Sequence, residues 1–233
     1  MRRVQERSAS VMPVVLLLVV LSVVSVAAPV RAAIGSRSDS RPAPAGAGQW
    51  ITVTATSHQS TYASLSAYRR ARGRWVPVFG PWRARVGFNG IARPGAKREG
   101  DGRTPAGTYG LGFFFGVLPD PGVAFPFRRA RSYDVWDDDP ASPRYNEWVD
   151  RRRHDPGRNP EPMDRQPAYD YAAVIRYNVA RVPGLGSAIF LHVGTGSATA
   201  GCVSLPRHEL LAILRWLRPR QSPRITIRVA AGT

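Results

Sequence analysis

Two side chains near the end of the chain have the types and spacing of a catalytic pair. Cys202 is the single cysteine among the 233 residues, and it follows Gly201. His192 ends an apolar run ten residues earlier, and the small, polar loop 194–200 separates the two. Such a loop is flexible enough to bring an imidazole to a thiol. Because an imidazole-activated thiolate attacks carbonyl carbons and holds the acyl group as a thioester, the pair predicts cysteine acyl transfer.

Each of these residues alone also has a purely structural interpretation. A lone cysteine is usually a buried small hydrophobe, and a single histidine at a strand end is more often structural than catalytic. The combination of histidine, glycine-rich loop and Gly-Cys favours function. We expect the helix that follows Cys202 to favour its thiolate, and nearby backbone amides to form an oxyanion hole. His58, His154 and His208 are other candidate bases, which we expect to take no part.

The first residues predict export. Three arginines stand among the first seven residues, 14–28 is apolar apart from two serines, and Ala32 is the small residue that signal peptidase needs. We predict a signal peptide over 1–32. An uncleaved membrane anchor is the alternative, because 11–30 approaches the length that spans a bilayer. An exposed thiol outside the cell is prone to oxidation, which favours a cysteine with a function.

The composition limits the classes of protein that fit. A single cysteine excludes an intrachain disulfide, a cysteine-based zinc site and an iron–sulfur cluster. The 43% apolar content excludes a disordered chain. The 33 basic and 16 acidic residues give a net charge of +17, but the arginines are scattered without a nucleic-acid-binding motif. We predict no nucleic acid partner, attraction to anionic cell-wall polymers, no metal and no cofactor.

The patterning predicts a mainly β domain with one helix. Residues 33–49 have the Pro/Gly-rich composition of a flexible linker, so the folded domain is expected over 50–233. Residues 101–111 are expected to form a loop, and apolar residues at helical spacing predict a helix between Pro206 and Pro219. Alternation of period two predicts a hairpin and further strands. The expected strands are 62–68, 75–79, 82–91, 113–115, 173–177, 188–192 and 224–229.

The segment 134–171 has a different character. It is rich in proline, carries the acidic run 137–139 and has no periodicity. A segment of this length inside a compact domain is usually a functional lid or disordered, and its aromatic residues favour order. We expect a long, irregular lid over the cleft. The acidic run is expected to be a solvated loop, and the functional alternative is that it attracts the amine of an acceptor.

The residues around the pair resemble a known family. His192, a short Gly-rich loop, Gly201-Cys202-Val203 and a following helix resemble the signature of the L,D-transpeptidase (YkuD-type) catalytic domain. Residues 103–109, Arg-Thr-Pro-Ala-Gly-Thr-Tyr, resemble the Thr-Pro-x-Gly loop of the same family. The resemblance implies a YkuD-like β-sandwich over 50–230.

The resemblance also implies roles for single residues. Cys202 is the implied nucleophile and His192 the implied general base, with the backbone amides of Gly201 and Cys202 as oxyanion donors. The residues expected to bind the substrate or its oxyanion are Gly194, Thr199, Gly201 and Ser204. The chain has Ala200 where the family usually has a second histidine, and Ser204 where it usually has an arginine. These departures predict a divergent subgroup.

Members of this family cross-link or trim peptidoglycan stem peptides outside the membrane. The resemblance therefore implies an exported, cell-wall-associated cysteine transferase that acts on donor and acceptor stem peptides. Two alternatives stay open. One is an L,D-carboxypeptidase that uses the same site with water as the acceptor. The other is a non-catalytic module that binds the cell wall through its basic charge.

Overall fold

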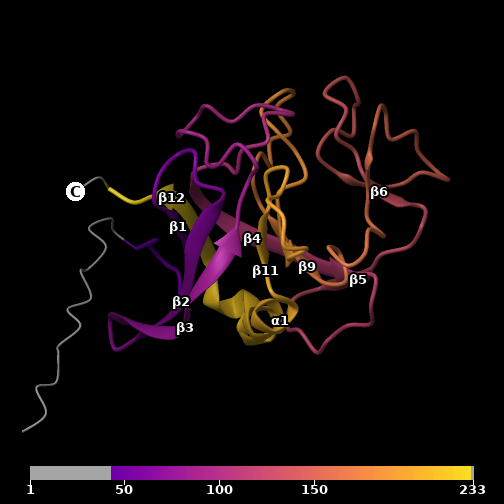
Figure 1. Cartoon of the computed structure of the whole chain (residues 1–233). Coiled ribbons are helices and arrows are strands. Elements are labelled where there is room, and N and C mark those ends of the chain that lie inside the picture. Colours follow the sequence, from indigo (N-terminus) through magenta and orange to yellow (C-terminus); the bar gives the residue numbers. More distant parts are fainter. Residues whose placement is uncertain (1–42, 232–233) are drawn as a thin grey trace, which may run out of the picture. The chain divides into compact units, whose positions relative to one another are not determined.

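The computed structural model describes residues 43–231, a mainly β chain with one α-helix and one short 3₁₀ helix (Figure 1). The predicted signal peptide, 1–32, and residues 33–42 of the predicted linker lie outside the described residues. The helical elements are α1 (Arg207–Trp216) and η1 (Pro219–Gln221). The strands are β1 (Gln49–Ala55), β2 (Tyr62–Ala71), β3 (Arg74–Arg85), β4 (Gly107–Gly116), β5 (Phe127–Arg129), β6 (Asp134–Trp136), β7 (Trp148–Asp150), β8 (Glu161–Pro162), β9 (Ala172–Ile175), β10 (Phe190–Val193), β11 (Val203–Leu205) and β12 (Arg224–Val229). No helix in this part of the chain has both the length and the apolar character needed to cross a membrane.

Nine of the strands form one sheet, in the order β12-β1-β2-β3-β11-β10-β9-β4-β5. β4 also pairs antiparallel with β12, with Thr108 opposite Thr226, so the sheet closes on itself in a barrel-like ring. The mainly β class and the single C-terminal-region α-helix are confirmed. The expected two-layer sandwich is not confirmed, because the β4–β12 pairing joins what would be two separate layers into one barrel-like sheet, with β5 left as an edge strand beside β4.

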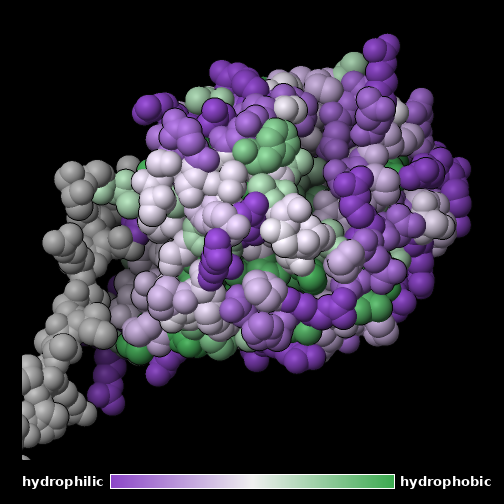
Figure 2. Space-filling model, in the orientation of Figure 1, coloured by the Kyte–Doolittle hydropathy of each residue, from purple (hydrophilic) through white to green (hydrophobic). Residues whose placement is uncertain are grey.

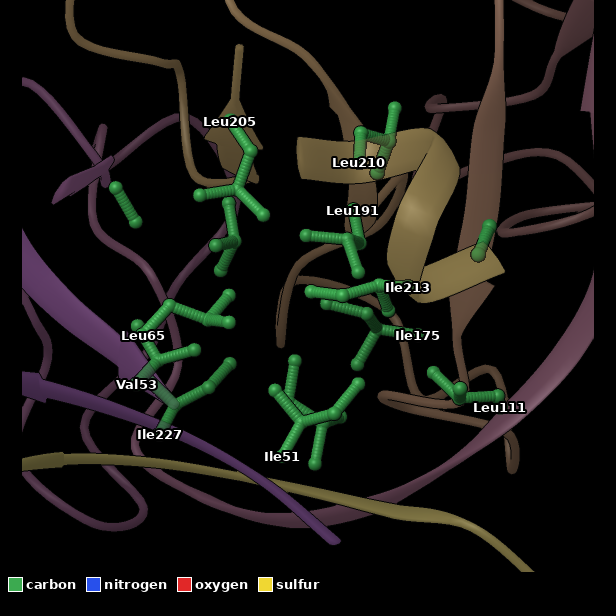
Figure 3. Packing of buried hydrophobic residues seen from close by; sticks show 14 of the residues in the cluster. Ile51, Val53, Leu65, Leu111, Ile175, Leu191, Leu205, Leu210, Ile213 and Ile227 are labelled. Carbon is green, nitrogen blue, oxygen red and sulfur yellow. The ribbon is translucent and has the colours of Figure 1, made fainter. Parts of the chain in front are cut away.

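Apolar side chains from strands on different parts of this barrel-like sheet meet in its interior (Figure 3). Ile51 of β1, Leu65 of β2 and Leu191 of β10 are fully buried. The helix α1 packs against β10 and β11 and adds Leu210 and Ile213 to the same core. The face of the molecule drawn in Figure 2 is largely hydrophilic, with hydrophobic residues in small, separate patches. The core thus supports the strand β10, which carries His192.

Several of the expected elements are present. The predicted hairpin is formed by β2 and β3, and Arg72 and Gly73 both have positive φ, as a tight hairpin turn requires. The predicted helix is α1, which begins after Pro206. The expectation of a loop over 101–111 is wrong in its second half, because β4 begins at Gly107. Pairing with β9 and β12, both distant in sequence, overrides the local Gly-rich pattern.

The segment 134–171 is ordered around a small second sheet, in the order β7-β6-β8. Val135 pairs with both Val149 and Pro162 across this sheet. Tyr145 and Met163 are almost completely buried in the same segment. β6 lies well apart from β1, β2 and β3 (Figure 1). This segment supplies one side of the cavity described next, while its action as a lid stays a prediction.

Candidate active site

One cavity of about 300 Å³ brings the predicted catalytic pair together. Cys202, from the turn before β11, and His192, from β10, both line it. Thr199 and Ser204 line the same cavity. β10 and β11 are adjacent parallel strands, with His192 directly opposite Ser204 in register. The pairing of these two strands therefore explains why residues ten apart in sequence reach one cavity.

Four hydrogen bonds fix Cys202 in place. Its Sγ donates to the Ala188 carbonyl at 3.2 Å and accepts from the Phe190 amide at 3.3 Å. Its carbonyl oxygen accepts from the Thr199 hydroxyl at 2.7 Å and the Thr104 hydroxyl at 3.1 Å. The sulfur and the backbone of the nucleophile are therefore both held before any substrate binds, which lowers the entropic cost of aligning it for attack.

Thr104 is a positioning residue that the sequence patterns did not single out. Its hydroxyl accepts from the Gly87 amide at 2.8 Å while it donates to Cys202. Thr199 is tied to the same region, because its amide donates to the Val86 carbonyl at 2.9 Å. The signal for Thr104 was present in the Thr-Pro-x-Gly resemblance, which marks the loop but not the role of the threonine.

Gly201 occupies a position that only glycine tolerates. Its φ is +152°, and an added Cβ would lie 3.1 Å from the Arg103 carbonyl oxygen. This close approach places the backbone of Arg103 against Gly201, the residue before the nucleophile. The Gly201 amide donates to the Thr199 hydroxyl at 3.2 Å, so its predicted role as an oxyanion donor requires that this bond be released. The Cys202 amide is the other predicted donor.

The buried imidazole of His192 is oriented by the backbone carbonyl of the next residue, Val193. Nδ1 lies 2.8 Å from the Val193 carbonyl oxygen. Because a carbonyl oxygen only accepts, Nδ1 carries the proton and Nε2 keeps the lone pair of a base. The ring of Tyr169 meets the imidazole edge to face, with centroids 5.6 Å apart. Among the described residues, no hydrogen bond links His192 to Cys202, so direct proton transfer between them requires a movement or a bridging substrate group.

Burial keeps both members of the pair neutral. It raises the pKa of Cys202 to about 12, although the bond from the Phe190 amide lowers it. It lowers the pKa of His192 to about 4, against a raising effect of its bond to Val193. The expectation that the following helix favours the thiolate is therefore not met, because burial outweighs it. The helix α1 begins only at Arg207, too far along the chain for its N-terminus to offset the burial of the sulfur.

The other predicted site residues lie close to the pair. Ser204 is 1% exposed, and its Oγ is buried without a hydrogen-bond partner among the described residues. The Gly194 amide donates to the Leu205 carbonyl at 2.6 Å, and the neighbouring Thr195, rather than Gly194, is part of the cavity lining. The lining contains His192 and none of the remaining histidines, His58, His154 and His208.

Sequence reasoning missed most of the charged lining. Glu99, Asp138 and Glu161 line the cavity. Asp138 and Glu161 belong to the segment 134–171, and Glu99 belongs to the long connection between β3 and β4. Of the acidic run, Asp138 alone faces the cavity. Its neighbour Asp137 accepts from the Ser142 hydroxyl at 2.5 Å and holds the loop. No group of three or more His, Cys, Asp or Glu within 43–231 is arranged to hold a metal ion.

One of the comparisons with known proteins identifies a family. A family model described as the L,D-transpeptidase catalytic domain, YkuD, matches residues 48–227, a range that includes Cys202 and His192. A search of curated proteins found no match. Among solved structures, the chain is similar to the helical cell shape determining protein Pgp2 from Campylobacter jejuni, with 14% identity, a TM-score of 0.39, and coverage of 79% of this chain and 48% of that one. The chain thus spans about half the length of that protein. Because the family model matches most of the sequence, this chain belongs to the L,D-transpeptidase (YkuD) catalytic domain family.

Proposed function

We propose that this chain is an exported cysteine acyltransferase that acts on peptidoglycan stem peptides. The observation that carries the proposal is the shared cavity of Cys202 and His192, in which the nucleophile is held by hydrogen bonds and the imidazole presents Nε2 as a base. The family supplies the substrate class. The geometry supports the proposed reaction type, because a held thiol and an oriented imidazole in one cavity suit thioester chemistry.

The first half of the proposed reaction forms the thioester. His192 Nε2 takes the Sγ proton of Cys202 as Sγ attacks the carbonyl carbon on the L-centre of the third stem residue. The carbonyl oxygen becomes an oxyanion, which backbone amides at 201–202 stabilise. The carbon–nitrogen bond to the terminal D-Ala then breaks, and the leaving amine takes the proton from His192. The acyl group is left on Cys202 as a thioester.

The second half transfers the acyl group. An amine from a neighbouring stem attacks the thioester carbon and gives a proton to His192. The carbon–sulfur bond breaks, and Cys202 recovers its proton. Because both residues are neutral at rest, each half reaction moves a proton onto the imidazole in step with attack, rather than starting from a stored ion pair.

The test is intact-protein mass spectrometry of the purified chain with a tetrapeptide stem and, separately, with a carbapenem, which is a β-lactam acylating agent. We expect an acyl adduct on Cys202 that is missing in Cys202→Ala. Cys202→Ser is the matched control, because it keeps the approximate size of the side chain while replacing the thiol with a hydroxyl, which is a weaker nucleophile. Folded protein that forms neither adduct nor product across neutral pH would overturn the proposal and favour the cell-wall-binding alternative.

The products separate the two enzymatic alternatives. Cross-linked dimers indicate that an amine resolves the thioester, as in a transpeptidase. Tripeptide without dimer, even with excess acceptor, indicates water and an L,D-carboxypeptidase. The adduct on Cys202 is expected in both cases, so the identity of the nucleophile is tested independently of the acceptor.

A further inference from the structure

Three carboxylates line the cavity that holds Cys202. They belong to Glu99, Asp138 and Glu161, which we call the carboxylate wall. The whole chain has only 16 acidic residues and a net charge of +17, so the sign of the wall opposes that of the rest of the molecule. A cavity lined by one sign of charge concentrates ligands of the opposite sign. The wall therefore favours a cation next to the nucleophile.

The basic residues at the cavity do not cancel the wall. Lys97 Nζ lies 2.7 Å from Asp101 Oδ1, so its charge is balanced by a carboxylate outside the lining. Arg165 lies 3.5 Å from Glu161, and its side chain is 58% exposed to solvent. An ion pair as exposed as this one is strongly screened. Above about pH 7, where Asp138 is ionised, the two lining cations thus leave most of the negative charge of the wall in place.

Glu99 and Asp138 are held by neutral groups or by none. Glu99 accepts from the hydroxyls of Tyr145 and Ser187, the latter at 2.8 Å. Asp138 Oδ1 is buried and has no hydrogen-bond partner within the described chain. Neither carboxylate forms an ion pair with another residue in 43–231. Hydroxyl partners fix the position of a carboxylate without neutralising it.

Two buried polar atoms of the lining lack partners. One is Asp138 Oδ1, and the other is the Oγ of Ser204, a residue that is 1% exposed and lies beside His192 in the sheet. Buried polar groups in folded proteins almost always have a hydrogen-bond partner. Two unpaired atoms in one cavity are therefore available to bind a polar ligand.

We propose that the carboxylate wall binds a free ammonium group of the acyl-donor peptide and thereby selects the donor. The inference rests on the proposed function, which places the scissile carbonyl of that peptide at Cys202. An ammonium has three hydrogens to donate and no acceptor, which matches carboxylates that lack cationic partners. A donor whose amine is acetylated offers neither the charge nor the three donors, and binds more weakly.

The wall suits the donor better than the acceptor for a chemical reason. An acceptor amine must lose its proton before it attacks a thioester, and nearby carboxylates stabilise the protonated form. An acceptor held at the wall would therefore be unreactive, whereas a donor ammonium takes no part in the reaction. This replaces the expectation that the run 137–139 attracts the acceptor, and Asp138 is the member of that run that lines the cavity.

The first test measures the charge of the cavity through the only thiol of the chain. Cys202 is reacted with a cationic methanethiosulfonate (a trimethylammonium-ethyl reagent) and with an anionic one (a sulfonatoethyl reagent). The thiolate attacks the sulfenyl sulfur, a disulfide forms, and a sulfinate leaves. The rate with the cationic reagent is divided by the rate with the anionic reagent, and this ratio is divided by the same ratio measured for 2-mercaptoethanol. Both reagents react with the same thiolate, so a change in the thiolate fraction of Cys202 cancels. We expect a normalised ratio of about five or more, which falls in 1 M salt.

Matched variants test whether the carboxylate wall causes the normalised rate ratio. In Glu99→Gln, in Asp138→Asn and in the double variant, we expect the normalised ratio to fall stepwise toward one. Asp164→Asn removes the same charge from an exposed position outside the lining, and should leave the ratio unchanged. Circular dichroism confirms that each variant is folded, and the single variants keep the test valid if the double variant is not. An equal fall in Asp164→Asn would overturn the assignment.

The second test measures ligand selection without turnover. Two tetrapeptides ending in D-Ala, identical except for L-Lys or Nε-acetyl-L-Lys at the third position, are titrated into Cys202→Ala by calorimetry. We expect the free-amine peptide to bind about tenfold more tightly, and the preference to fall below about twofold when Glu99→Gln and Asp138→Asn are added. Equal affinities, or a preference that survives these changes, overturn the proposal.

The outcomes separate this proposal from the proposed function. If Cys202 forms an acyl adduct but the two peptides bind equally, the acyltransferase stands and the ammonium site falls. If the reagent ratio responds to the wall variants but neither peptide binds, the cavity attracts cations and the assignment of a peptide donor is what fails.

Discussion

The two sides of the cavity are built in different ways. On the nucleophile side, β10, β11 and the turn before β11 hold Cys202 and His192 through backbone partners and threonine hydroxyls. The charged part of the lining, here called the carboxylate side, consists of Glu99, Asp138 and Glu161, which stand on loops and on the short strand β8, and Asp138 Oδ1 has no hydrogen-bond partner among the described residues. The reacting atoms are thus fixed by the sheet, whereas the charge is supplied by loop segments.

This difference separates catalysis from selection. Residues that act on a bond must be held within a fraction of an ångström, and strands with short hydroxyl contacts give that rigidity. Charge acts over several ångströms and needs less exact placement, so loops suffice. Changes on the nucleophile side should therefore alter the rate of acylation, and changes on the carboxylate side should alter which donor is bound.

Removal of the base should have the largest effect on the nucleophile side. His192→Gln keeps a buried polar side chain but cannot take the proton of Cys202 at neutral pH. We expect kcat/KM for acylation to fall about 10²- to 10⁴-fold, the usual range for a lost general base. Stopped-flow acylation by a carbapenem measures the rate, and Glu99→Gln is the comparison variant from the other side. An equal loss in both variants would contradict the division of roles.

The reactivity of Cys202 toward alkylation should show that the thiol is neutral at rest. Iodoacetamide reacts with the thiolate, and burial raises the pKa of this thiol to about 12. The alkylation rate should therefore rise about tenfold per pH unit between about pH 6 and pH 10, without a plateau. A plateau near neutral pH would mean that a thiolate–imidazolium pair forms after all. Intact mass confirms that Cys202 is the modified residue.

Loss of the hydroxyls that hold the Cys202 carbonyl should have a moderate effect. Thr199→Val keeps the shape of the side chain but removes the donor of a 2.7 Å bond to that carbonyl. We expect a loss of about 1–2 kcal/mol in the free energy of unfolding, and about a tenfold lower acylation rate. Thr199→Ser restores the hydroxyl and should restore the rate. Thr195→Val, an exposed hydroxyl of the same loop, should leave stability nearly unchanged.

More of the nucleophile side of the cavity than of the carboxylate side could be predicted from the sequence. His192, Gly201 and Cys202 are local in sequence, and the helix that follows them is predicted by its periodicity. Closure of the sheet depends on β4 pairing with β12, more than a hundred residues away, and no local pattern specifies it. The same holds for Glu99, which reaches the cavity only through the fold. Partner strands and loops decide such positions, not the residue's own neighbours.

The smallest expected effect is on stability, and it comes from the carboxylate side. Burial raises the pKa of Asp138 to about 7, with an opposing effect from Ser187 and further raising effects from Glu161 and Glu99. Between its ordinary pKa of 3.8 and about 7, the folded protein keeps a proton that the unfolded chain loses. Stability therefore falls as pH rises through this range, and the loss is complete above it.

Asp138→Asn removes this titration and should expose it in thermal melts. The variant should match the parent near pH 4, where the aspartate is protonated in the folded protein, and melt a few degrees higher near pH 8, since about 1 kcal/mol shifts the Tm of a domain of this size by about 2–4 °C. Asp164→Asn should show no such pH-dependent gain.

If the carboxylate wall holds an ammonium, the free-amine peptide should stabilise Cys202→Ala more at pH 8 than at pH 5. Adding Asp138→Asn to Cys202→Ala should remove most of this stabilisation by the peptide. The reason is that the ionised Asp138 carboxylate destabilises the free protein and also binds the ammonium of the peptide.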